Sequence, residues 1–84
     1  IALAPRQPIY LLEKASLNVR VARYAEALPI LEVLTEAFPD DADCNRLLGF
    51  CYIQLGDKSR GIPYLEKAVT LGDGGASALL ERYK

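Results

Sequence analysis

Histidine is absent from this 84-residue sequence. It is the commonest general base, the usual partner of a serine or cysteine nucleophile, and the commonest metal ligand in proteins. Nothing else in the chain resembles a catalytic constellation. We therefore expect no enzymatic activity, no catalytic residue, no cofactor and no metal site in this sequence.

Cysteine is scarce, and the two thiols, Cys44 and Cys51, lie seven residues apart on one predicted helix. Their separation along the helix axis is about 10 Å. Because bridged Cα atoms lie within about 7 Å of each other, a disulfide between them is excluded while the helix is intact. We predict two reduced, buried thiols, which weakly favours a reducing compartment such as the cytoplasm and otherwise leaves localisation open.

Long apolar runs are also missing, since none approaches the roughly 18 residues of a membrane span. The formal net charge is only −1, and the basic residues are scattered among acidic ones, so no basic stripe marks a nucleic-acid site. We expect neither a membrane nor a nucleic acid as a partner. With 51% hydrophobic and 25% charged residues, the composition is that of one ordinary globular domain.

A repeated pattern is present instead. Residues 27–32, with the sequence ALPILE, align with residues 61–66, GIPYLE, at an offset of 34 residues, and Pro5 and Pro39 are separated by the same distance. A fixed period of this length indicates supersecondary units that bury their apolar faces by stacking on one another. The chain therefore favours a stacked scaffold that presents a surface.

Turn and capping residues divide the repeats into helices. Pro39-Asp40, Gly56-Asp57 and the sequence DGG at residues 73–75 mark boundaries. We predict helices over residues 8–21, 24–37, 42–55, 58–71 and 75–84. Pro29 and Pro63 then lie about one turn into the second helix of each unit, or at its first residue if that helix begins later.

The matching positions resemble the tetratricopeptide repeat, which has a leucine-glycine pair, an aromatic residue three positions later, then a small and a large apolar residue. The residues that carry this resemblance are Leu48, Gly49, Tyr52, Gly61, Leu65 and Ala68. The first unit fits less well, because Lys14 replaces the leucine and Asn18 the aromatic residue. The resemblance implies an all-α fold of antiparallel helix-turn-helix units stacked as a right-handed α-solenoid.

Under this interpretation residues 1–84 form a single domain. Residues 1–7 would end a preceding repeat, 8–41 and 42–75 would be two full repeats, and 76–84 would begin the next one. Apolar residues at both ends, including Ile1, Leu3 and Leu79, would be expected inside a longer array. The alternative is that these apolar ends mediate self-association.

Small residues at positions 15, 27, 49 and 61 indicate places where two helices cross closely. Gly61 stands where the first unit has Ala27, and glycine inside a helix costs about 1 kcal/mol relative to alanine. The cost indicates unusually tight packing at Gly61, and the alternative is drift at a tolerant position.

The resemblance implies that the first helix of each unit lines a concave groove that binds a peptide or protein segment. The groove residues would then be Ile9, Leu12, Glu13, Ser16, Arg20, Asp43, Arg46, Leu47, Phe50, Gln54, Ser77, Leu80 and Glu81. Their mixture of apolar side chains and arginines suits a ligand that buries apolar groups and offers a carboxylate. Leu12 and Leu47 would equally suit packing between neighbouring first helices.

Two branches of the family help to narrow the function. One branch clamps a C-terminal carboxylate with lysine, asparagine and arginine, and this sequence lacks that clamp: the corresponding positions hold Leu12, Ser16, Leu47, Ser77 and Glu81. Another branch consists of chaperones that hold secreted hydrophobic segments, and an apolar groove fits it loosely. The remaining alternative is a structural, self-associating spacer without a groove ligand.

Overall fold

The computed structural model describes residues 7–83 and contains five α-helices. They are α1 (Gln7–Arg20), α2 (Tyr24–Ala37), α3 (Ala42–Gln54), α4 (Lys58–Thr70) and α5 (Gly74–Tyr83). Within the described residues there is no β-strand, and none of the helices has the length and apolar character that a membrane span requires. The predicted all-α fold is confirmed, and each helix end that the structure describes lies within one residue of its predicted position.

The helix bounds do not coincide with the edges of the predicted repeat units. Gln7, which the sequence interpretation placed in a preceding unit, is the first residue of α1. Gly74 and Gly75, placed in the unit 42–75, begin α5 because the carboxylate of Asp73 caps that helix. The predicted end of a preceding repeat at residues 1–6 lies outside the described residues.

Aspartates start three of the helices. The side chains of Asp41, Asp57 and Asp73 accept hydrogen bonds from the backbone N–H three residues later, at 3.1, 3.1 and 3.2 Å. Each carboxylate satisfies an N–H that the helix leaves without a partner, and it lies at the positive end of the helix dipole. At the turn after α3, Gly56 has a φ of +90°, which glycine adopts without strain.

Both prolines of the repeated pattern lie inside helices. Because α2 begins at Tyr24 and α4 at Lys58, the alternative that Pro29 and Pro63 open their helices is wrong. Both prolines are on the exposed sides of their helices. The carbonyl group that each proline deprives of an N–H partner is therefore within reach of water, which makes the interruption tolerable.

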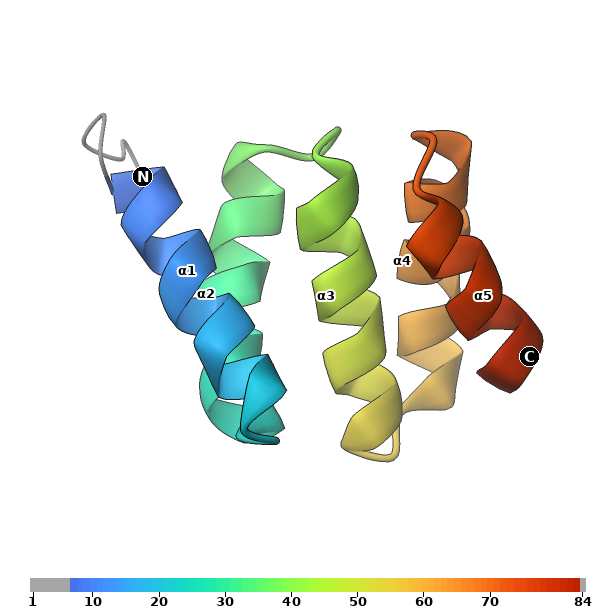
Figure 1. The fold of residues 1–84 in the computed structure, drawn as a ribbon, viewed down its shortest axis with the longest axis horizontal. Helices are drawn as coiled ribbons and strands as arrows, with labels where there is room; N and C mark the ends of the chain where they lie inside the picture. The colour runs from blue at the N-terminus through green and yellow to red at the C-terminus, as the bar shows by residue number, and fades with distance from the viewer. Residues whose placement is uncertain (1–6, 84) are drawn as a thin grey trace.

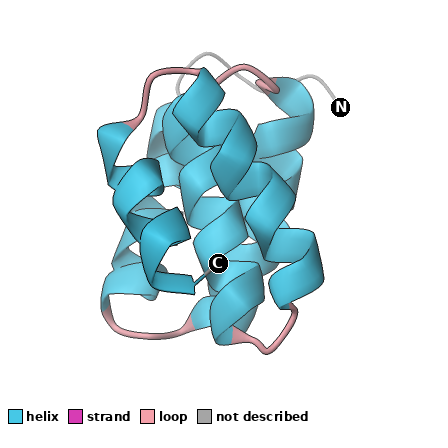
Figure 2. Ribbon diagram, turned by 90° about the vertical axis from the view of Figure 1, so that its right-hand side faces the viewer, coloured by secondary structure: helices cyan, strands magenta, loops and turns pink. Residues whose placement is uncertain are grey.

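The helices form two layers, with α1, α3 and α5 in one layer and α2 and α4 behind them (Figure 1). We call α1, α3 and α5 the first-helix layer. The backbone of α3 contacts those of α1 and α5, whereas the described backbones of α2 and α4 are not in contact. Because neighbouring backbones are closer together in the first-helix layer than in the layer of α2 and α4, the stack bends toward the first-helix layer. Figure 2, seen from the α5 end, shows that short loops at the ends of the helices connect them.

The core lies between the layers. Its larger part is built by α1, α2 and α3 around Leu31, Leu34 and Leu48, and a smaller part around Leu65 joins α4 to α5. Between these parts α3 and α4 meet at two glycines. A Cβ atom added to Gly49 would lie 2.7 Å from the Gly61 carbonyl oxygen, and one added to Gly61 would lie 2.5 Å from the Gly49 carbonyl oxygen. The tight-packing interpretation of Gly61 is therefore supported over drift.

Candidate functional site

The thirteen residues predicted to line a groove all lie on the first-helix layer, and they differ in exposure. Seven are exposed: Ile9, Glu13, Arg20, Asp43, Gln54, Ser77 and Glu81. The other six are half-buried: Leu12, Ser16, Arg46, Leu47, Phe50 and Leu80. Leu12 and Leu47 pack against the larger core and Leu80 against the smaller one, so packing accounts for part of each of these side chains.

Phe50 lies in a row of aromatic rings. Its ring is 5.7 Å from that of Tyr24 and 6.3 Å from that of Tyr83, both in edge-to-face geometry. The Gln54 side-chain amide donates a hydrogen bond of 2.9 Å to the Tyr83 hydroxyl. These contacts join α3 to α2 and α5. Phe50 and Gln54 therefore form a supported surface in which each side chain has a partner already.

Arg46 is held within the protein. Its guanidinium lies 3.1 Å from the carboxylate of Asp73 and 3.5 Å from that of Asp43, and Asp73 is largely buried. Asp73 stands where the first unit has Pro39. The predicted role of Arg46 toward a ligand carboxylate would require it to leave Asp73.

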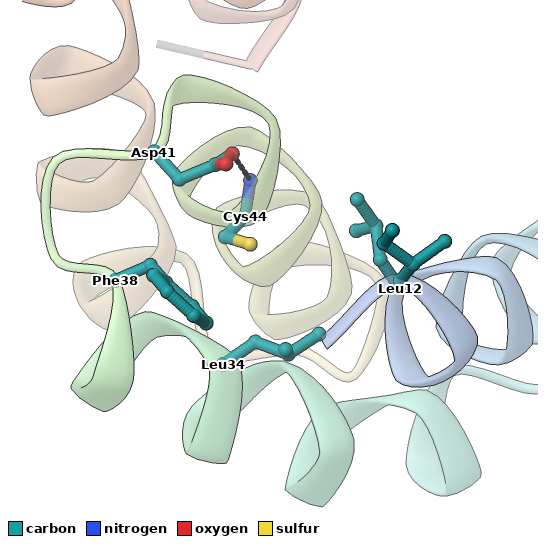
Figure 3. A pocket seen from close by; sticks show the side chains of 6 residues that line it. Leu12, Leu34, Phe38, Asp41 and Cys44 are labelled. Atoms are coloured by element: carbon teal, nitrogen blue, oxygen red, sulfur yellow. Dashed lines mark hydrogen bonds between the residues drawn. The ribbon is translucent and has the colours of Figure 1, made fainter. Parts of the chain in front are cut away.

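An open apolar pocket lies where α1, α2 and α3 meet. We call it the apolar socket, and Ile9, Leu12, Leu34, Phe38, Asp41 and Cys44 line it. Its volume is about 180 Å³. Figure 3 shows the labelled side chains from the three helices around one space, with Asp41 bonded to the Cys44 backbone N–H at its edge. The socket thus unites two predicted groove residues, Ile9 and Leu12, with the loop after α2.

The sequence explains the shape of that loop. Pro39 disfavours a helical conformation in the residue before it, and Phe38 accordingly leaves the helix with a φ of −131°. Phe38 remains 43% exposed at the edge of the socket. The fully buried Asn45 donates hydrogen bonds to the carbonyl oxygens of Pro39 and Asp41, at 3.0 and 2.8 Å. These bonds fix the loop against α3.

The two cysteines are buried, unpaired thiols, as expected for packing residues. Burial, reinforced by the negative charge of Asp41, raises the pKa of the Cys44 thiol to about 12. Burial alone raises the pKa of Cys51 to about 11. Because the thiolate is the reactive form, neither side chain is suited to act as a nucleophile.

A second hollow lies on the other layer, between α2 and α4. Glu32, Thr35, Glu36, Leu48 and Tyr64 line it, with a volume of about 330 Å³. The Tyr52 hydroxyl donates a hydrogen bond of 3.3 Å to Glu32, and the Tyr52 and Tyr64 rings stack at 5.8 Å. This hollow follows from the gap between the two helices. Across residues 7–83, we find no cluster of three or more acidic or cysteine side chains that could hold a metal ion.

Sequence reasoning missed five residues that shape this surface: Tyr24, Phe38, Asn45, Asp73 and Tyr83. For Asp73 a signal existed, because an aspartate breaks the repeated proline position. For Phe38 the signal was the following residue, Pro39, which disfavours a helical conformation at position 38. Tyr24, Asn45 and Tyr83 act through contacts between helices that the repeat period does not specify.

Comparison with known proteins agrees with the architecture. The family model of the tetratricopeptide repeat matches residues 21–79, which is more than half of the chain. No curated protein and no solved structure gave a significant match. Repeats of this kind generally mediate protein–protein interaction and are typically scaffolds without catalytic activity. With the described helices stacked in two layers, this chain belongs to the tetratricopeptide repeat family.

Proposed function

We propose that the exposed side of the first-helix layer binds a peptide or protein segment. The observation that carries the proposal is the arrangement of the layers: α3 contacts α1 and α5, whereas the described backbones of α2 and α4 do not meet. The stack therefore curves toward the first-helix layer, and a curved surface surrounds an extended or helical segment better than a flat one does.

The composition of this surface suits a peptide rather than a small molecule. Exposed carboxylates at Glu13, Asp43 and Glu81 accompany the half-buried Phe50 and Leu80. Aromatic side chains held by neighbours supply contact area at low entropic cost, and exposed charges around them supply specificity. Arg20, exposed at the end of α1, is better placed than Arg46 to meet a ligand carboxylate.

A pair of matched double variants tests this function. Glu13→Arg with Glu81→Arg reverses two exposed charges on the first-helix layer, while Glu26→Arg with Glu36→Arg does the same on α2. In affinity capture from lysate, the unmodified chain and the α2 variant should retain a partner that the first-helix variant loses. All three should have the same helicity by circular dichroism. Equal capture by all three, or loss caused by the α2 variant alone, would contradict binding on this layer.

A second candidate function is stacking through the outer face of α1. Tyr10 and Leu17 are 62% and 54% exposed. One repeat later their equivalents, Cys44 and Cys51, are buried where α3 meets α2. By this equivalence another helix would cover the outer face of α1. A longer array of repeats or a second copy of the chain would supply that helix.

A further inference from the structure

The apolar socket differs from the equivalent place in the second unit. At an offset of 34 residues, Ile9 and Leu12 correspond to Asp43 and Arg46, and Pro39 corresponds to Asp73. In the second unit Arg46 pairs with Asp43 within α3 and with Asp73, which links α3 to the start of α5. A Cβ atom at Gly75 would lie 3.7 Å from the Arg46 side chain, so that place is filled. The first unit instead leaves an open apolar hollow.

The walls of the socket expose apolar surface that the fold itself does not cover. Ile9 is 65% exposed and Phe38 43% exposed, and they approach the hollow from α1 and from the end of α2. Leu34 and the Cys44 thiol, each at most 2% exposed, form its buried side. A volume of about 180 Å³ can receive one large apolar side chain.

The surroundings of the socket are acidic. Asp41 lines it as the N-cap of α3, and Asp43 lies in the first turn of the same helix. Asp43 and Asp73 share the single guanidinium of Arg46, which leaves negative charge in excess. This negative charge also acts on the Cys44 thiol. Burial raises the pKa of the thiol most, and the carboxylates of Asp41 and Asp43 raise it further. A cation next to the socket would be attracted.

We propose that the apolar socket is the anchor site for a peptide segment that carries a large apolar side chain flanked by lysine or arginine. The apolar side chain enters the hollow between Ile9 and Phe38, and the neighbouring cation meets Asp41 and Asp43. The proposal rests on the binding function of the first-helix layer and adds the ligand class. Charge complementarity favours a basic segment as the occupant of the socket, because an acidic segment would be repelled by the carboxylates at its entrance.

Three synthetic peptides test the ligand class in an NMR titration of the ¹⁵N-labelled chain. The first has a central phenylalanine between lysine and arginine, the second replaces the phenylalanine with serine, and the third replaces both cations with glutamate. The first should shift the backbone amides of Leu12, Leu34 and Cys44. The other two should bind at least about tenfold more weakly, because burial of a phenylalanine or pairing of a charge contributes that much.

Variants locate the site. Ile9→Ser and Phe38→Ser remove exposed apolar surface and should each weaken the first peptide severalfold while leaving helicity unchanged. Leu55→Ser removes an apolar side chain of comparable exposure, 45%, away from the socket and should leave the affinity unchanged.

Several outcomes would overturn the proposal. Equal binding of the three peptides, no binding of any, or amide shifts confined to Phe50 and Ser77 would remove the socket as an anchor. The last result would leave binding on the first-helix layer standing, and the charge-reversal capture tests that layer separately. If the amide signals of the socket residues shift when the protein is diluted without peptide, the site would be assigned to a second copy of the chain. If the same amide signals shift when Ile1 and Leu3 are replaced with serine, the site would be assigned to the chain's own first residues.

Discussion

Gly49 and Gly61 show how one atom sets the distance between two helices. The equivalent residues of the first unit, Ala15 and Ala27, are fully buried, so α1 and α2 meet with two methyl groups in their contact. Between α3 and α4, methyl groups added at Gly49 and Gly61 would lie 2.7 and 2.5 Å from backbone carbonyl oxygens. Backbone atoms cannot move aside as the end of a flexible side chain can, so the second pair of helices requires glycine at both positions.

The substitution Gly61→Ala would place a methyl group in this contact. Helix propensity alone predicts that the substitution stabilises the protein by about 1 kcal/mol. The collision with the Gly49 carbonyl oxygen and Ile53 should outweigh this gain, and we expect a net loss of about 1–3 kcal/mol in the free energy of unfolding.

Urea denaturation followed by circular dichroism measures this effect. Gly74→Ala is the matched control, because nothing lies within 4 Å of a Cβ atom at that position. It should be neutral or slightly stabilising. If Gly61→Ala is as stable as the control, the α3–α4 contact is looser than the 2.5 Å approach of the added Cβ atom to the Gly49 carbonyl oxygen indicates.

At the scale of helices, Asp73 performs two roles at once. Its Oδ1 atom caps α5 through the Ala76 N–H at 3.2 Å, and its Oδ2 atom lies 3.1 Å from the Arg46 guanidinium on α3. The side chain is only 9% exposed, so these charge-assisted bonds are largely shielded from water. The start of α5 is thereby tied to the middle of the stack.

We therefore expect Asp73→Ala to be costlier than the loss of an ordinary cap. Removal of the cap and of a partly buried ion pair should lower the free energy of unfolding by about 2–3 kcal/mol. Asp57→Ala removes the cap of α4, where the carboxylate is more exposed and contacts its own helix, and should cost about 1 kcal/mol. Chemical denaturation of both variants gives the comparison. Equal losses would mean that the bond to Arg46 contributes nothing.

The helices were predictable from the sequence because their boundaries are set locally. Aspartates, glycines and Pro39 lie at the ends, and the 34-residue period fixes which helices are equivalent. The fate of Arg46 was not predictable in the same way, because Asp73 lies 27 residues away and the two meet only when α5 docks. The groove assignment for the thirteen residues stays a prediction. The socket required the loop held by Asn45, which exists only in the assembled fold.

At the scale of the whole molecule, the outer face of α1 is the second candidate interface that we propose. Tyr10 and Leu17 have buried equivalents one repeat later, and Lys14 corresponds to the buried Leu48. If second copies cover this face, light scattering should show a particle mass that rises with concentration above the 9.2 kDa of one chain. Tyr10→Glu with Leu17→Glu should abolish the rise.

The control for this prediction is Leu55→Glu, which changes an exposed apolar residue at the far end of α3. It should associate as the unmodified chain does. A constant mass of one chain across the dilution series would contradict self-association. The surface would then remain a candidate only for a neighbouring repeat.

Among the described helices, α3 alone has a backbone in contact with all four others. The α1–α2 pair is therefore joined to the α4–α5 pair chiefly through this one helix, beside the exposed ion pair between Lys67 and Asp40. The pair α1–α2 lies on one side of α3 and the pair α4–α5 on the other, and α3 contacts both pairs. A displacement of one pair relative to the other would have to be accommodated at the surface of α3, where the 3.1 Å bond between Arg46 and Asp73 holds the start of α5.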